Sequence, residues 1–271
     1  NASPKCWGTS TMIAPGFANV EAQLWIWLIA MIRPGAAFLA APIFGARVVP
    51  VQLRLIVSLA IGMAAMNAVV FTPPAGGVVS FAGILLVISE VLIGLAMGFA
   101  VQIGYSAAFV AGESIANVMG LGFAAMVDPQ SGASSQVVSQ FLSIIATFLL
   151  LGMDGHLMLA SFIVDSYKAL PPGGPLLPNE AIYDLVLFGG SLFGAGLTIA
   201  LPVGFALILI QLVMGMLARS APSLNLFAVG MPVALISGLV LLAIAAPVMS
   251  AGIADAIQMG LDHAQSIAQG K

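Results

Sequence analysis

The chain has 271 residues, of which 61% are hydrophobic and only 6% are charged, and its mean hydropathy is +1.14. Soluble globular proteins carry about a quarter charged residues, so too few charges are present to cover a water-facing surface. This composition indicates an integral membrane protein. The net charge of −3 argues against binding to nucleic acid, and the single cysteine excludes an intrachain disulfide and a cysteine-based zinc cluster.

The first eleven residues differ from the rest of the chain. They include Pro4, Lys5 and Gly8 and show no apolar period, whereas Met12 reads as a natural beginning. We therefore expect residues 1–11 to be a non-native or disordered leader.

Six apolar runs follow in chain order. A helix needs about 20 residues to cross a bilayer, at a rise of about 1.5 Å per residue. The second run has a suitable length, but the third, fourth and fifth are well over it. Their excess length predicts steep tilt, an internal break, or a helix that continues inside a protein assembly. The runs are 22–44, 55–71, 81–111, 137–164, 182–218 and 224–249.

Two sequence features indicate interruptions between or within the later apolar runs. Gly189-Gly190 and Pro202 lie inside the fifth run and predict a break or kink there. The proline- and glycine-rich linker 171–178, between the fourth and fifth runs, is the best candidate for a boundary between two halves.

Scarce cations give a first prediction of membrane orientation. If all six runs crossed the membrane, the bias of basic residues toward cytoplasmic loops would place Arg47, Arg54 and Arg219 in the cytoplasm. Both termini would then lie outside. The prediction assumes that every run spans the membrane, which the uneven run lengths call into question.

The segment 113–136 breaks the pattern of simple spans. Its apolar centre is too short to cross a bilayer, and Gly120 and Gly122 weaken it as a helix. Asp128-Pro129 ends the apolar stretch, and serines and glycines follow. We expect this segment, which begins at Glu113, to be re-entrant or to line a cavity; an ordinary interhelical loop is the alternative.

Two ionisable residues lie inside apolar runs. Arg33 is in the first run and Glu90 is in the third. A charge at membrane depth needs a partner or a wet cavity. Arg33 and Glu90 could pair with each other or with another subunit, and a carboxylate such as Glu90 could serve a transporter as a proton relay.

Enzyme signatures are missing from the sequence. It has no HExxH, GxSxG or P-loop pattern, and its two histidines, His156 and His263, exclude a histidine-rich metal site. We predict no catalytic residue, no metal site and no cofactor, and we expect His156 to be a hydrogen-bonded structural residue.

Glycine and methionine are abundant, with 30 and 14 copies. Gly-x-x-x-Gly spacing occurs at 94–98 and 190–194, and such spacing lets helix backbones approach closely. Met119 and Met126 lie in the glycine-rich segment, where deformable side chains suit a soft constriction or ordinary core filling.

Several stretches taken together resemble the FliR/SctT family of flagellar and type III secretion export-gate proteins. No single stretch is decisive, but they occur in order over most of the chain from about Met12 onward. They are Ala41-Pro42-Ile43-Phe44 to Arg47-Val48-Val49-Pro50; Gly112-Glu113, Met119-Gly120-Leu121-Gly122-Phe123 and Val127-Asp128-Pro129; Gly155-His156-Leu157, Val164-Asp165 and Leu170-Pro171; and Arg219-Ser220-Ala221-Pro222, Asn225-Leu226-Phe227 and Gly230-Met231-Pro232.

The resemblance implies an all-α, polytopic fold within a helical hetero-oligomeric export gate of the bacterial inner membrane and flagellar basal body. Residues 12–178 would form a FliP-like part, and residues 179–271 a FliQ-like hairpin. FliP-like and FliQ-like subunits, FlhB-like and FlhA-like export components and membrane lipid are the implied partners. Unfolded flagellar or effector proteins would pass through the gate. Some helices would then lie above the membrane plane, and six simple crossings would be wrong.

The resemblance also implies a role for the segment around 113–136, which in this family plugs the closed channel. The implied plug residues are Met119, Gly120, Leu121, Gly122, Phe123 and Met126. Arg33, Glu90, Glu113 and Asp128 are expected to be structural charges. A secondary transporter or ion-coupled carrier that uses buried carboxylates remains the alternative function.

Overall fold

In the computed structural model, the chain is described over residues 18–66, 80–122, 137–174, 177–220 and 226–270. The elements within these ranges are all helices, which confirms the predicted all-α class of a polytopic membrane protein. The helices are α1 (Ala18–Ala40), α2 (Val51–Met66), α3 (Phe81–Val118), α5 (Val137–Gly152), α6 (Gly155–Ala169), α7 (Asn179–Ser220) and α8 (Leu226–Ala268).

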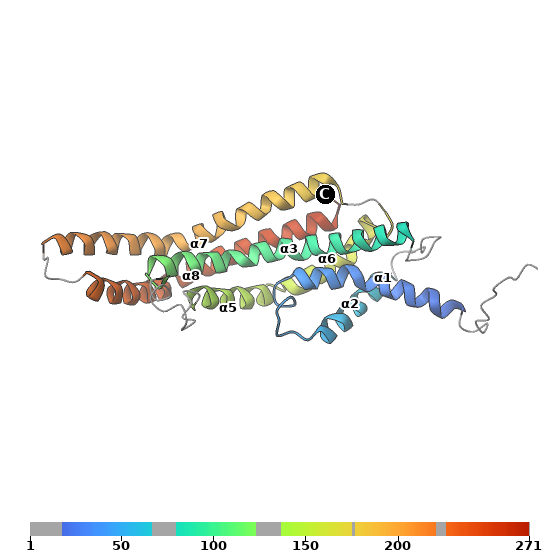
Figure 1. The fold of residues 1–271 in the computed structure, drawn as a ribbon, viewed down its shortest axis with the longest axis horizontal. Coiled ribbons are helices and arrows are strands. Elements are labelled where there is room, and N and C mark those ends of the chain that lie inside the picture. The colour runs from blue at the N-terminus through green and yellow to red at the C-terminus, as the bar shows by residue number, and fades with distance from the viewer. Residues whose placement is uncertain (1–17, 67–79, 123–136, 175–176, 221–225, 271) are drawn as a thin grey trace, which may run out of the picture.

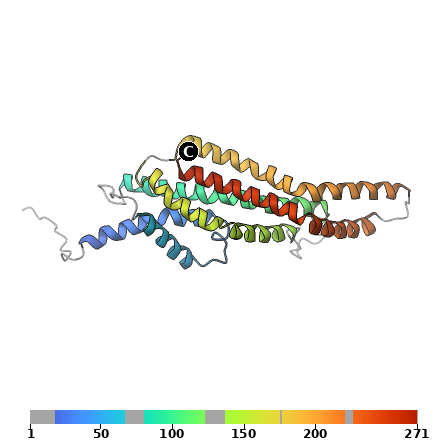
Figure 2. The same ribbon diagram turned by 180° about the vertical axis from the view of Figure 1, so that it is seen from behind.

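The helices form an elongated bundle with α3 in its middle (Figures 1 and 2). α3 packs against α1, α5, α7 and α8, while α2 lies against α1 and α6. A cluster of buried apolar side chains includes residues of every described helix. The α7–α8 hairpin projects beyond the end of α3 (Figures 1 and 2).

Close packing around α3 depends on glycine. At Gly94 and Gly98, a Cβ atom would meet the backbone of α1 at Arg33 and Ala37. At Gly104, it would meet the backbone of α8 at Ala256. Helices can approach to this degree only where a side chain is missing. The predicted motif 94–98 is therefore an internal helix contact.

Two apolar runs keep their continuity despite helix-breaking residues. α1 continues through Pro34, and α7 continues through Gly189, Gly190 and Pro202, so the fifth run, for which a break or kink was predicted, is not broken. α7 does change direction partway along its length (Figures 1 and 2). Proline removes one backbone hydrogen bond and clashes with the preceding turn, which bends a helix more often than it ends one when neighbours support it.

The fourth apolar run contains an internal break, which is one of the three explanations that its excess length predicted. α5 ends at Gly152 and α6 begins at Gly155, with an angle of 59° between them. Asp154 joins the two helices in the left-handed conformation, at φ 56°. Aspartate tolerates this conformation better than most side chains.

Within the described residues, three helices are long and apolar enough to cross a membrane. They are α3, α7 and Val229–Ala268 of α8, and the bent pair α5–α6 would make a fourth if it forms one span. Two further apolar stretches are shorter, Leu24–Ala40 of α1 and Val51–Ala65 of α2. The described residues therefore contain fewer than six helices of spanning length, and the orientation built on six crossings stays a prediction.

The two Gly-x-x-x-Gly motifs give a matched test of this packing. Gly98→Ala should lower the free energy of unfolding by about 1–3 kcal/mol, because its Cβ meets the α1 backbone at Ala37. Gly190→Ala is the control, since nothing lies within 4 Å of the Cβ site there and alanine favours a helix by up to about 1 kcal/mol. Thermal unfolding in detergent, followed by circular dichroism, measures both. Equal effects would contradict the α1–α3 packing.

Candidate functional site

A buried ion pair joins α1 to α3. The Nε of Arg33 donates to Oε2 of Glu90 at 2.8 Å, and Nη2 donates to Oε1 at 2.7 Å. The two side chains are 0% and 1% exposed. This fork-to-carboxylate geometry satisfies both carboxylate oxygens at once. The sequence left open whether Arg33 and Glu90 pair with each other or with another subunit. In the structure they pair with each other.

α6 completes the surroundings of the guanidinium. Nη1 of Arg33 donates to the hydroxyl of Ser166 at 2.9 Å, and Nη2 also donates to the carbonyl oxygen of Leu170 at 2.8 Å. The guanidinium carbon lies 4.1 Å from the ring centre of Tyr167, a cation–π contact. The hydroxyl of Tyr167 in turn donates to the carbonyl of Ala30 at 2.9 Å. The cluster therefore ties α1, α3 and α6 together with its charges well satisfied.

The polar partners on α6 could not be found from the sequence. Ser166, Tyr167 and Leu170 are more than 130 residues from Arg33, and a carbonyl group has no sequence signature. The ion pair itself could be predicted from the sequence, because two opposite charges in otherwise apolar runs are candidate partners for each other.

Removing one charge of the buried pair tests its structural role. Glu90→Gln should destabilise the chain by about 3–5 kcal/mol, because it leaves the Arg33 guanidinium buried with no counter-charge. The exposed pair of Asp165 with Lys168 supplies the control, and Asp165→Asn should cost less than about 1 kcal/mol. Unfolding in detergent compares the two. If the double variant Arg33→Glu with Glu90→Arg is no more stable than either single change, the pairing does not hold the fold together.

The glycine-rich end of α3 is the second feature of interest. The backbone N–H of Gly120 donates to the carbonyl of Asn117 at 3.1 Å, and that of Leu121 donates to the carbonyl of Ala116 at 3.0 Å. Gly120 has φ 81°, which a residue without Cβ adopts at low cost. This pair of bonds is a Schellman motif, so Gly120 terminates α3 in a defined geometry.

The C-terminal hairpin holds this end of α3. Met119 is 2% exposed, and its side chain packs on Gly238 of α8, where a Cβ would lie 2.6 Å from Cε of Met119. The side-chain amide of Gln211 on α7 donates to the carbonyl of Val118 at 2.6 Å. That carbonyl belongs to the last turn of α3, whose oxygens have no helical partner. Two helices from the other half of the chain therefore fix where the following segment starts.

The beginning of the predicted segment 113–136 differs from expectation. Its first six residues continue α3, which ends at Val118. Gly112 lies against the backbone of Ser139 on α5, and the hydroxyl of Ser139 donates to Oε1 of Glu113 at 2.9 Å. This close packing keeps the helix regular through Glu113.

The remaining residues predicted for this segment divide into two groups. Leu121 and Gly122 are half-buried next to the end of α3. Phe123, Met126 and Asp128 lie outside the described residues.

The polar residues at the start of α6 do not form a catalytic arrangement. Asp154 is exposed, and the hydroxyl of Ser161 donates to the carbonyl of Met158 at 2.7 Å. Nδ1 of His156 is buried and has no hydrogen-bond partner within the described ranges, so the expected hydrogen bond is missing at that atom. No hydrogen bond links Asp154, His156 and Ser161 in this part of the structure.

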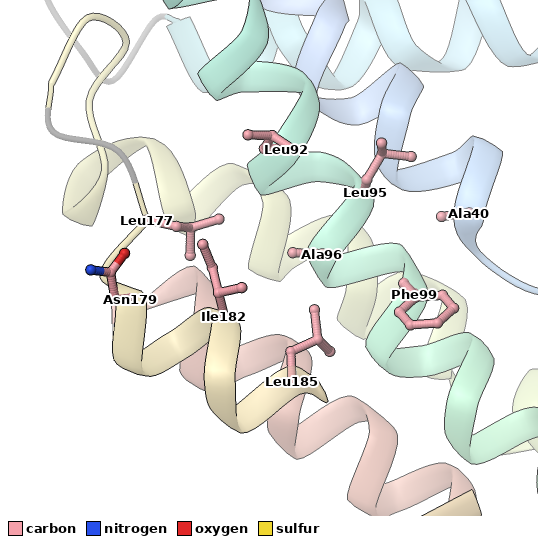
Figure 3. A pocket seen from close by; sticks show the side chains of 9 residues that line it. All are labelled: Ala40, Leu92, Leu95, Ala96, Phe99, Leu177, Asn179, Ile182 and Leu185. Atoms are coloured by element: carbon pink, nitrogen blue, oxygen red, sulfur yellow. The ribbon is translucent and has the colours of Figure 1, made fainter. Parts of the chain in front are cut away.

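An apolar pocket of about 510 Å³ lies where the chain enters α7 (Figure 3). Ile182 and Leu185 of α7 face Ala96 and Phe99 of α3 across it, and Asn179 at the start of α7 lies at its edge (Figure 3). The two halves of the chain therefore meet along α3 as well as at the linker.

The contact between Met119 and Gly238 can be tested in the isolated chain. Gly238→Val should displace Met119 and raise amide hydrogen exchange at residues 119–121 about tenfold or more, because the Schellman motif loses its support. Gly215→Val on α7 is the matched control, since nothing lies within 4 Å of the Cβ site of Gly215. Exchange measured by mass spectrometry would contradict the contact if both variants behaved like the parent chain.

Comparisons with known proteins give a consistent result. The family model of bacterial export proteins, family 1, matches residues 24–260. The flagellar biosynthetic protein FliR of Escherichia coli K12 is 36% identical over 232 residues, covering 84% of this chain and 86% of that protein. FliR of Pectobacterium carotovorum is 41% identical over 63% of this chain and 65% of its own length. FliR of Caulobacter vibrioides is 31% identical over 82% of this chain and 88% of its own length.

Proposed function

This chain belongs to the bacterial export proteins, family 1, and on that premise we propose that it is a non-catalytic core subunit of the flagellar or type III protein export gate. The observation that carries the proposal is the family match over residues 24–260, which covers α3 and α7 in full and most of α8. In this proposal the chain lines the export channel and plugs it when closed, and unfolded flagellar or effector proteins pass through.

The uneven burial of the long helices supports a place inside an assembly. Half of the most apolar window of α3 is buried within the chain, compared with 22% in α7 and 17% in α8. Large apolar side chains such as Phe193, Phe205 and Ile244 remain exposed. Exposed apolar surface on this scale needs lipid or another subunit to cover it. We propose that FliP-like and FliQ-like subunits cover much of it, with FlhB-like and FlhA-like components nearby.

We further propose that the two halves of the chain have distinct kinships. Residues 12–178 would be the FliP-like part, and residues 179–271 the FliQ-like hairpin made by α7 and α8. The gate would lie in the bacterial inner membrane at the flagellar basal body.

The proposed plug begins at Met119 and extends through Gly120, Leu121 and Gly122 to Phe123 and Met126. Its support in the described residues is the fixed starting point: Gly120 ends α3 sharply, and Met119 is held by α8. A short segment that leaves a rigid helix end can fill a narrow channel and still swing aside, and methionine side chains adapt to an irregular gap.

The alternative of a proton-coupled transporter receives no support at Glu90. A relay carboxylate must exchange protons with a wet pathway, whereas both oxygens of Glu90 accept from Arg33 in a buried site. Asp154 is exposed at the junction of α5 and α6 and likewise has no described partner that marks an ion path.

Deletion of residues 120–126 tests the plug in the assembled gate. The variant should co-purify with its partner subunits, but it should leak small ions across the membrane, because the segment that fills the closed channel is gone. Conductance in planar bilayers and swimming motility measure the effect. Deletion of residues 73–77, in the loop before α3, is the control and should not leak. Unchanged conductance and motility after the 120–126 deletion would reject the plug, and failure of the parent chain to co-purify would reject the subunit assignment.

A further inference from the structure

A groove of about 630 Å³ runs between α7 and α8 on the exposed side of the hairpin. Ser191, Gly194 and Thr198 line it from α7, and Gly252, Asp255 and Met259 line it from α8. Small side chains make the groove open to a rod-shaped ligand, and Asp255 is its single carboxylate.

Asp255 has no counter-charge within the described ranges. No hydrogen bond or ion pair there involves its carboxylate, although Asp262, two turns further along α8, accepts a hydrogen bond from Gln258 at 2.8 Å. The only lysine or arginine in the described part of the hairpin is Arg219, at the far end of α7. Arg219 is 21 residues beyond Thr198, so it lies roughly 30 Å away along the helix at 1.5 Å per residue.

The surroundings make an unpaired carboxylate costly. α7 and α8 are both long and apolar enough to span a membrane, and the exposed apolar side chain of Val248 lines the groove. A charge among such helices normally faces a partner charge or a wet cavity. The described hairpin carries four acidic residues and one basic residue, so a partner of positive charge complements it: Glu180, Asp184, Asp255 and Asp262 against Arg219.

We propose that this groove binds a helix of a neighbouring subunit and that this helix brings a lysine or arginine side chain to Asp255. The inference rests on the proposed place of the chain in a multi-subunit gate and adds the contact that selects the neighbour. Charge complementarity at a single position of an interface fixes the register and choice of a partner helix more than it adds general affinity.

The shape of the groove fits a helix. Nothing lies within 4 Å of the Cβ site of Gly194, whereas the equivalent site of Gly98 meets the α1 backbone. The motif 94–98 is thus occupied inside the chain, whereas Gly194 of the motif 190–194 opens onto the groove. Its partner helix can approach closely, which brings a long basic side chain within reach of the carboxylate.

Charge variants of Asp255 test the inference in the whole chain. The tagged chain is co-expressed with its FliP-like and FliQ-like subunits, and the partner subunits recovered with it are quantified by mass spectrometry. Asp255→Asn should lower recovery about tenfold or more, because it leaves the partner's basic group without a counter-charge. Asp255→Lys should lower it further, and Asp255→Glu should restore most of it.

Asp262→Asn is the matched control, because Asp262 is an exposed aspartate of the same helix outside the groove. It should leave recovery within about twofold of the parent chain, as expected for an exposed charge. Equal losses in Asp255→Asn and Asp262→Asn would overturn the groove assignment, as would full recovery with Asp255→Asn. If the parent chain recovers no partner, the proposed function itself fails.

Thiol labelling locates the contact. In a Cys6→Ser background, Thr198→Cys places the only thiol of the chain in the groove. A maleimide should label it in the isolated chain but not in the assembly, and adding Asp255→Asn should restore labelling. Equal labelling of the isolated and assembled chains would overturn the proposal.

Discussion

The fold depends on how closely its neighbours approach the backbone of α3. Glycine at 94 and 98 brings α1 into backbone contact, Gly104 does the same for α8, and Gly112 admits Ser139 of α5. Helices in an apolar environment gain little from excluding water, so dense packing between backbones takes over much of that role. The helices that pack against α3 come from both halves of the chain, which is why the halves share one apolar core.

Among the described residues, the buried charges Arg33 and Glu90 lie in one cluster, where hydrogen-bond partners surround them. Arg33 places four hydrogen bonds and a ring contact within one cluster, and those partners come from α3 and α6. Ion pairs of this kind add little net stability compared with apolar packing, but they tolerate only one relative placement of the helices that carry them. In a chain with 6% charged residues, such a pair selects among the many ways in which apolar helices can pack.

The two ends of the bundle differ in how much of their surface the chain covers itself. Around α1, α3 and α6, buried polar groups bind one another and buried apolar side chains pack together within the chain. Along α7 and α8 most of the apolar surface faces outward, and Asp255 faces a groove. The same hairpin holds the end of α3 through Gly238 and Gln211. A helix that bound the outer face of the hairpin would therefore be coupled through rigid elements to the segment after α3, within the proposed gate.

The sequence by itself determined the membrane class, the approximate extents of the apolar runs, and the two charges that had to find a partner. These features follow from composition and from the length of each apolar run, because the bilayer constrains the composition and length of each segment separately. It also pointed to residues 119–122, where a glycine had to interrupt a helix. Only the tertiary structure decided which Gly-x-x-x-Gly motif is internal and that the side chain of Met119 packs on Gly238. It also decided that the chain breaks between α5 and α6 at Asp154, whereas α7 continues through Pro202. Spacing along a helix specifies which residues share a face, but the rotation and crossing of helices more than a hundred residues apart decide what that face meets.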